Sequence, residues 1–247
     1  MSAVILALVA GAVIGLALGA LGGGGSVLAV PALIYLLGFT PVAASTASLV
    51  IVAVTSATAL SAHAREGNVR WRTGLLFAAA GIGPAIFGGV VAGKLPAAAL
   101  TCAFSVVAGL AAVRMLRPGP TVAAMQVRPV RAAGAGAGLG AVTGVLGVGG
   151  GFLAVPALVG VLGLRMREAV GTSLLVISIN SLAALVTRAD TGDGMNWAVV
   201  GPFAGAAVLG AWDGKRLASK VSGRTLQRIF ALVLLAVAVF MLIDVIV

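Results

Sequence analysis

The sequence predicts an all-α integral membrane protein of two inverted repeats, each with about five hydrophobic segments and a glycine-broken or re-entrant half-helix. Three observations lead to this prediction: the composition, an internal duplication, and the placement of basic residues. Of the 247 residues, 61% are hydrophobic and only 9% are charged, whereas soluble domains carry about 25% charged residues. So few charges cannot cover a water-facing surface, and the chain is therefore expected to lie in a lipid bilayer.

A glycine-rich stretch occurs twice. Residues 21–33 read LGGGGSVLAVPAL, and residues 146–158, 125 positions later, read LGVGGGFLAVPAL. An ungapped match that continues on both sides indicates a duplicated unit. The predicted repeats are residues 1–116 and 130–247, joined by a cytoplasmic linker over 117–129. The matched pairs include Gly11 with Gly136, Gly15 with Gly140, Gly19 with Gly144, Gly38 with Gly163, Ser48 with Ser173, Ser56 with Ser181 and, after one inserted residue, Trp71 with Trp197.

Charged and turn residues divide the chain into ten apolar segments. Most approach the ~20 residues that span a bilayer core of ~30 Å. The second and seventh have only twelve residues, about 18 Å of helix, so each is expected to be a half-helix or one arm of a re-entrant hairpin. Both begin at a glycine cluster and carry a proline, Pro31 or Pro156, near their start. In order, the segments are 3–21, 26–37, 42–62, 73–93, 97–116, 130–146, 151–162, 169–187, 197–211 and 226–247.

The basic residues favour ten segments that alternate in direction. If every short segment counts as a separate segment, whether it crosses or re-enters, the gaps fall on alternating sides. Fourteen Lys and Arg then lie on one side and two, Lys94 and Arg188, on the other. Joining each short segment to its neighbour as one long crossing gives eight on each side instead. Because Lys and Arg gather in cytoplasmic loops, the first arrangement is preferred. Both termini then lie outside, and five segments per copy place the copies in opposite orientations, a pattern of secondary transporters.

The glycine clusters are the predicted anion site. Adjacent small residues at a helix start leave backbone N–H groups uncovered at its partially positive end. Two inverted copies would bring two such ends together near the midplane as a cradle for a small anion. The alternative is that these glycines only let helices approach closely. That reading suffices for Gly15 and Gly140, where alanine is expected to act mildly. The cradle residues are Gly22, Gly23, Gly24, Gly25, Ser26, Gly147, Gly149, Gly150 and Gly151.

Hydroxyl and amide side chains on the third and eighth segments could assist. Ser48 and Ser173 coincide between the copies, and Thr172 precedes Ser173. Asn180 is the most polar point of the eighth segment, and a buried amide needs partners. It either lines the transport path or ties helices together.

Several other functions are excluded by the residue types present. The net charge of +10 sits in short gaps between apolar runs rather than on a polar scaffold, which argues against nucleic-acid binding. The single cysteine, Cys102, excludes an internal disulfide, and no motif indicates a metal site, a cofactor or catalysis. The six acidic residues fall in or near the gaps or at the C-terminal end, which argues against a proton relay. His63 is expected to be a solvated residue at a helix end.

The paired motifs resemble the TauE/SafE sulfite exporter family, also called the toluene sulfonate uptake permease family. The resemblance rests on the duplicated glycine-rich stretch ending in VPAL, the AVGTSL sequence at 169–174, and a glycine followed by tryptophan after the next segment. It covers nearly the whole chain, from residue 3 to about 242. It implies transport of small sulfur-containing or organic anions such as sulfite or sulfonates. The first copy has STAS at 45–48 where the second has VGTS.

The expected function is that of a transporter, most naturally an exporter, of a small sulfur-containing anion, and not of an enzyme. The expected partners are this anion and the lipid bilayer, in a multi-pass arrangement in the inner cell membrane. Two alternatives stay open: an anion channel with the same cradle, and a membrane scaffold without transport. The oligomeric state also stays open, with a homo-oligomer as one option.

Overall fold

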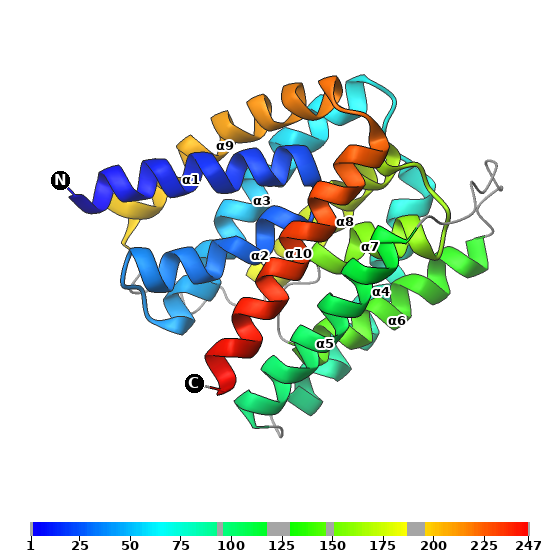
Figure 1. The fold of residues 1–247 in the computed structure, drawn as a ribbon, viewed down its shortest axis with the longest axis horizontal. Coiled ribbons are helices and arrows are strands. Elements are labelled where there is room, and N and C mark those ends of the chain that lie inside the picture. Colours follow the sequence, from blue (N-terminus) through cyan, green and yellow to red (C-terminus); the bar gives the residue numbers. More distant parts are fainter. Residues whose placement is uncertain (1, 93–95, 118–128, 147–150, 187–195, 247) are drawn as a thin grey trace.

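The computed structural model describes residues 2–92, 96–117, 129–146, 151–186 and 196–246 (Figure 1). Within these ranges the chain forms helices and no strand, and each of the ten predicted segments coincides with a helix. In order, the elements are α1 Ser2–Leu21, α2 Gly24–Pro31, the π-helical turn η1 Ala32–Leu36, α3 Pro41–Arg65, α4 Trp71–Ala92, α5 Ala97–Leu116, α6 Pro129–Leu146, α7 Gly151–Gly160, α8 Met166–Val186, α9 Trp197–Lys220 and α10 Gly223–Ile246.

At least five helices can cross a membrane. In the described ranges, α1, α3, α5, α8 and α10 are long and apolar enough to do so, which confirms an all-α, multi-pass membrane protein. The two short helices are different. With eight residues in α2 and ten in α7, they extend about 12 and 15 Å and cannot span a bilayer core of ~30 Å.

Both half-helices end in the same way. Gly38 and Gly163 occupy the same repeat position, and both adopt a left-handed φ of 69°. In each copy the next residue donates a hydrogen bond back to the sixth residue before it, from Phe39 N to Leu33 O and from Leu164 N to Leu158 O, both at 3.0 Å. Each glycine N–H also donates to the fourth residue before it, Ile34 O at 3.1 Å and Val159 O at 3.2 Å. This is the αL type of helix stop, which favours glycine because other residues rarely adopt a positive φ. The duplicated sequence therefore produces a duplicated helix stop.

Glycine faces join the outer helix pairs. α1 packs along α9, and α4 packs along α6. A Cβ at Gly11 would overlap the carbonyl oxygen of Phe203, and a Cβ at Gly136 would overlap that of Phe77. Phe77 and Phe203 are equivalent when the halves are compared with the one inserted residue. The expectation that these glycines allow close helix approach is confirmed.

The expectation that alanine acts mildly at Gly15 and Gly140 is wrong. A Cβ at Gly15 would lie inside the backbone of Ala207, and a Cβ at Gly140 inside that of Gly81. Backbone cannot move aside as a side chain can, so each pair of helices would have to separate. Overpacking of this kind typically destabilises a protein by about 1–3 kcal/mol.

The centre of the molecule is formed by α3 and α8, which pack against each other, and α5 packs along α10. The hydroxyls of Ser56 and Ser178, both buried, lie 2.9 Å apart and join α3 to α8. A buried polar pair of this kind satisfies two groups that water cannot reach. The α1–α9, α4–α6, α3–α8 and α5–α10 pairs each join a helix of the first half of the chain to a helix of the second half.

The basic residues that the structure describes lie at one end of the molecule, and we call it the basic end. It comprises the C-terminal ends of α3, α5 and α9 and the N-terminal ends of α4, α6, α8 and α10. Ion pairs and hydrogen bonds connect these ends, including Lys215 with Glu66 and Arg167 with the carbonyl of Ser219 at 2.9 Å. In Figure 1 the α9–α10 junction lies at the right, and both termini lie at the left.

The ninth segment is longer than the sequence predicted. The prediction ended it at residue 211 because Asp213, Lys215 and Arg216 follow, yet α9 continues to Lys220. In its last turns Asp213 and Arg216 are exposed and Lys215 is half-buried, while Gly214 and Ala218 stay buried. A helix can continue with one apolar face after its other faces become polar. The position of the first charged residues therefore predicted the C-terminal end of α9 too early.

Candidate functional site

The two glycine-rich chain breaks meet inside the molecule. A Cβ at Gly23, just before α2, would overlap the carbonyl oxygen of Gly151, the first residue of α7. Gly22 lies against α8, where an added Cβ would come within 2.5 Å of the Ser173 hydroxyl. All four residues are buried. We call this meeting of α1–α2, α7 and α8 the glycine crossing.

The glycine crossing depends on residues without side chains. Gly22 has a φ of 68°, a conformation that L-residues rarely adopt. It lets the chain reverse between α1 and α2, and its N–H still donates to Leu18 O at 2.8 Å. Ser173 donates its own hydroxyl to Val170 O at 2.8 Å within α8.

The structure does not bring the other predicted side chains to the glycine crossing. Ser48 is buried and donates to Ser45 O at 2.8 Å within α3. Thr172 lies beside α4 and accepts the backbone N–H of Arg70 at 3.1 Å. Asn180 lines a cavity of about 20 Å³ between α4, α6 and α8, with Phe77 and Gly140 among its neighbours. A cavity of that size holds about one water molecule.

Some predicted residues cannot be placed in this way. Gly147, Gly149 and Gly150 lie outside the described residues. The backbone of Gly24, Gly25 and Ser26 forms the first turn of α2, and their surroundings are not described. The predicted linker 117–129 also lies largely outside the described ranges.

A cleft of about 2510 Å³ opens at the basic end, between the ends of α4, α5, α6, α8 and α10. Its wall includes Val107 of α5 and Val142 of α6, which lie nine and thirteen residues from the basic ends of those helices. The cleft therefore extends about 14–20 Å along the helices. It also borders α7 from Leu153 to Gly160, so its wall comes within two residues of Gly151. This cleft was not predicted from the sequence.

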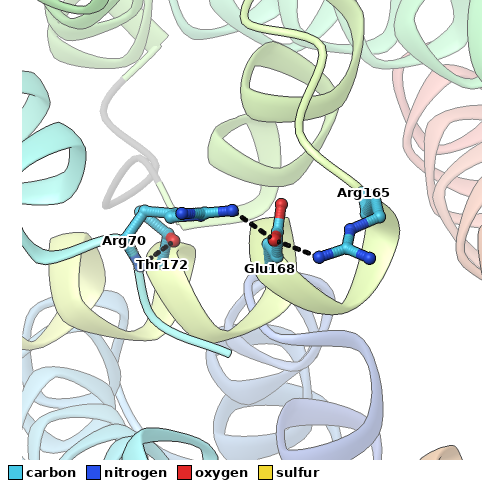
Figure 2. Close-up of polar contacts among 4 residues, drawn as sticks. All are labelled: Arg70, Arg165, Glu168 and Thr172. Carbon is cyan, nitrogen blue, oxygen red and sulfur yellow. Dashed lines mark hydrogen bonds and ion pairs between the residues drawn. The ribbon is translucent and has the colours of Figure 1, made fainter. Parts of the chain in front are cut away.

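A charge cluster lies in the wall of the cleft (Figure 2). Glu168, in the first turn of α8, accepts from Arg70 and Arg165, each at 2.8 Å and each at the same oxygen, Oε1. Thr172, one turn further along α8, holds the backbone of Arg70. The hydrogen bond that Arg165 donates to Glu168 and the negative charge of Glu168 raise the pKa of Arg165, which therefore stays protonated. The cluster joins the loop between α3 and α4 to the start of α8.

The structure changes the interpretation of two titratable residues. His63 is 5% exposed and not solvated as expected. Its Nε2 lies 3.2 Å from Gly19 O, and its Nδ1 has no hydrogen-bond partner among the described residues. Glu168 does lie at a helix start, but it is buried and held by two arginines. The sequence could have suggested this pairing, since Arg165 precedes Glu168 by three residues and a buried carboxylate needs partners.

These features define a multi-pass α-helical membrane protein with two short helices at its centre and a basic cleft that leads toward them. The model of the sulfite exporter TauE/SafE family matches residues 7–241. A probable membrane transporter protein of Xylella fastidiosa strain Temecula1 is 33% identical over 241 residues, covering 94% of this chain and 92% of that protein. Its counterpart in a second strain is 34% identical with the same coverage. No solved structure matches the chain at a significant level.

The chain therefore belongs to the sulfite exporter TauE/SafE family, as its paired motifs predicted. A more distant relative, the probable membrane transporter protein YunE of Bacillus subtilis, is 28% identical over 271 residues and matches 95% of this chain. The family and these relatives identify the chain as a membrane transporter.

Proposed function

We propose that this transporter exports a small sulfur-containing anion, sulfite or an organosulfonate, and holds it at the glycine crossing during transport. The observation that carries the proposal is the juxtaposition of Gly22, Gly23, Gly151 and Ser173 from two distant parts of the chain. Irregular backbone at membrane depth is tolerated only where protein buries it or where it lines a cavity. Two helix starts at one place supply N–H donors and partial positive charge to an anion. The family to which the chain belongs is named for the export of sulfite.

We further propose that the two halves are inverted repeats. The packing supports this because exchanging the halves converts the α1–α9 pair into the α6–α4 pair and leaves the α3–α8, α5–α10 and α2–α7 pairs unchanged. In Figure 1, α1 runs from left to right and its counterpart α6 runs from right to left. The basic end would face the cytoplasm by the positive-inside rule, and both termini would face outward.

The orientation can be tested with single cysteines, because the chain has only Cys102. In a Cys102→Ala background, a cysteine replacing Glu66, after α3, should be protected from a membrane-impermeant maleimide added to intact cells. A cysteine replacing Asn196, before α9, should react at once. Both positions are exposed in the structure. Equal labelling of the two would contradict inverted repeats.

Transport itself is tested in proteoliposomes loaded with sulfite, sulfoacetate, taurine or thiosulfate. We expect flux of sulfite or a sulfonate that saturates with concentration and is inhibited by the other sulfur anions. A channel using the same site would give much faster flux that does not saturate in this way. A scaffold protein would give no flux above empty liposomes. Either result would overturn the proposed function.

A further inference from the structure

In the Arg70–Glu168–Arg165 cluster, the arginines are arranged so that another anion could replace the Glu168 carboxylate. Both guanidiniums donate one nitrogen to the same carboxylate oxygen, Glu168 Oε1. A guanidinium has five N–H donors, and each of these two makes one hydrogen bond within the described part of the chain. Most of their donors can therefore take another acceptor. The side chains of Arg70 and Arg165 are 53% and 82% exposed, whereas that of Glu168 is 9% exposed. Figure 2 shows the two guanidiniums approaching Glu168 from opposite sides.

The wall around this cluster is strongly positive. Seven arginines line the described part of the cleft, and Glu168 is the acidic residue among them. A cleft lined by one sign of charge between low-dielectric walls concentrates ions of the opposite sign. The arginines are Arg70, Arg72, Arg114, Arg117, Arg165, Arg224 and Arg228. An anion that enters this cleft therefore meets far more positive charge than one carboxylate can neutralise.

We propose that Arg70 and Arg165 form a receiving site for the substrate's oxyanion, and that Glu168 is an internal competitor for the same two guanidiniums. The inference rests on the proposed function and adds residues of the cleft to it. The paired N–H donors of a guanidinium can bind two oxygens of one carboxylate or sulfonate group at once. While no substrate is bound, Glu168 accepts from both guanidiniums and so holds them on either side of one carboxylate oxygen.

The competition also explains how the anion can leave. A site of several free arginines would hold a small oxyanion too tightly for passage, because transport needs binding weak enough for release. Glu168 can reclaim both guanidiniums as the anion moves toward α7 and the glycine crossing. Thr172 supports this by fixing the Arg70 backbone, so the side chain can move while its base stays in place.

Kinetics distinguish a receiving site from a purely structural ion pair. With substrate supplied at the basic end, Arg70→Gln and Arg165→Gln should each raise KM about tenfold, since each removes a charge-assisted hydrogen bond. Glu168→Gln should lower KM several-fold, because the neutral amide competes less well. Arg131→Gln is the matched control: Arg131 is exposed at the start of α6, at the same end, and is not among the residues lining the cleft. A structural ion pair predicts changes in one direction for both partners, and that result would overturn the proposal.

A binding measurement tests the site without transport. Trp71 follows Arg70, lines the cleft and is half-exposed, so replacing Trp197 and Trp212 by phenylalanine makes it the sole tryptophan reporter. In nanodiscs of zwitterionic lipid, quenching of Trp71 by iodide, normalised to quenching by neutral acrylamide, reports the local anion concentration. The ratio should fall about threefold or more in Arg165→Gln, rise in Glu168→Gln and stay unchanged in Arg131→Gln. Methanesulfonate should protect Trp71 from iodide.

The outcomes separate the two proposals. If the quenching pattern holds but no sulfur anion is transported, the proposed function is wrong and the receiving site serves another oxyanion. If the protein transports sulfur anions but Arg70→Gln, Arg165→Gln and Glu168→Gln leave KM unchanged, and the last two also leave Trp71 quenching unchanged, the proposed receiving site is wrong. If anionic phospholipid in the nanodisc abolishes iodide quenching and methanesulfonate gives no protection, the arginines bind lipid headgroups, which also overturns the proposal.

Discussion

Replacing Gly23 by alanine is expected to lower anion flux strongly while leaving much of the protein folded. The new Cβ would overlap the Gly151 carbonyl oxygen, and real Cβ atoms essentially never approach another atom within 3.0 Å. Since both partners are backbone, the starts of α2 and α7 must move apart. A site built from backbone donors loses its geometry when they move by about 1 Å, and such displacements cost up to about a hundredfold in rate at catalytic sites. We expect a loss of at least about tenfold in anion flux per folded molecule.

Two other glycines make this experiment decisive. Gly15→Ala produces an equally severe overlap with Ala207, but at the α1–α9 interface and away from the glycine crossing. Gly109→Ala, in α5, meets nothing within 4 Å and should be neutral or slightly stabilising, since alanine is the better helix former. Folded protein is measured by size-exclusion chromatography and thermal unfolding. If Gly15→Ala and Gly23→Ala lose flux per folded molecule equally, the crossing is only a packing contact.

The sequence predicted the helices well because apolar length and glycine placement are local properties. Each of the ten segments coincides with a helix, and the duplication placed Gly38 and Gly163 at equivalent helix stops. The meeting of Gly23 with Gly151 could also be anticipated, because a duplicated unit with a broken helix tends to place its two breaks together. The side chains chosen to assist were predicted less well. Thr172 and Asn180 face different neighbours from Ser173, and only three-dimensional packing decides this.

What the sequence could not show depends on contacts between distant segments. Arg70 and Glu168 are 98 positions apart, and no periodicity links them. His63 stands next to a charged loop in sequence, yet it is buried because the end of α1 covers it, with Gly19 in contact. Charge near a helix end was taken to mean exposure, but in a membrane protein the ends of the helices also pack against one another.

Transport is expected to be electrogenic and to favour export without obligatory coupling to protons. The charged side chains that the structure describes in its helices all lie at the basic end, so none in the central part of the bundle neutralises the anion as it crosses. Moving one elementary charge through 100 mV is worth about 2.3 kcal/mol, which corresponds to roughly a 50-fold concentration ratio for a monoanion. A dianion would gain about twice that free energy. With the cell interior negative, the potential alone can drive export.

The measurement uses sealed vesicles with an imposed potassium diffusion potential and equal pH on both sides. Flux should rise as the compartment at the basic end becomes more negative, and reversing the potential should reverse its direction. His63 is the one histidine of the chain and is buried, so His63→Gln is the matched variant for any response to pH. Flux that ignores the potential, follows an imposed pH gradient and keeps doing so in His63→Gln would mean that the anion crosses protonated or with a proton. In that case the backbone site would carry a neutral species, and the potential would not drive export.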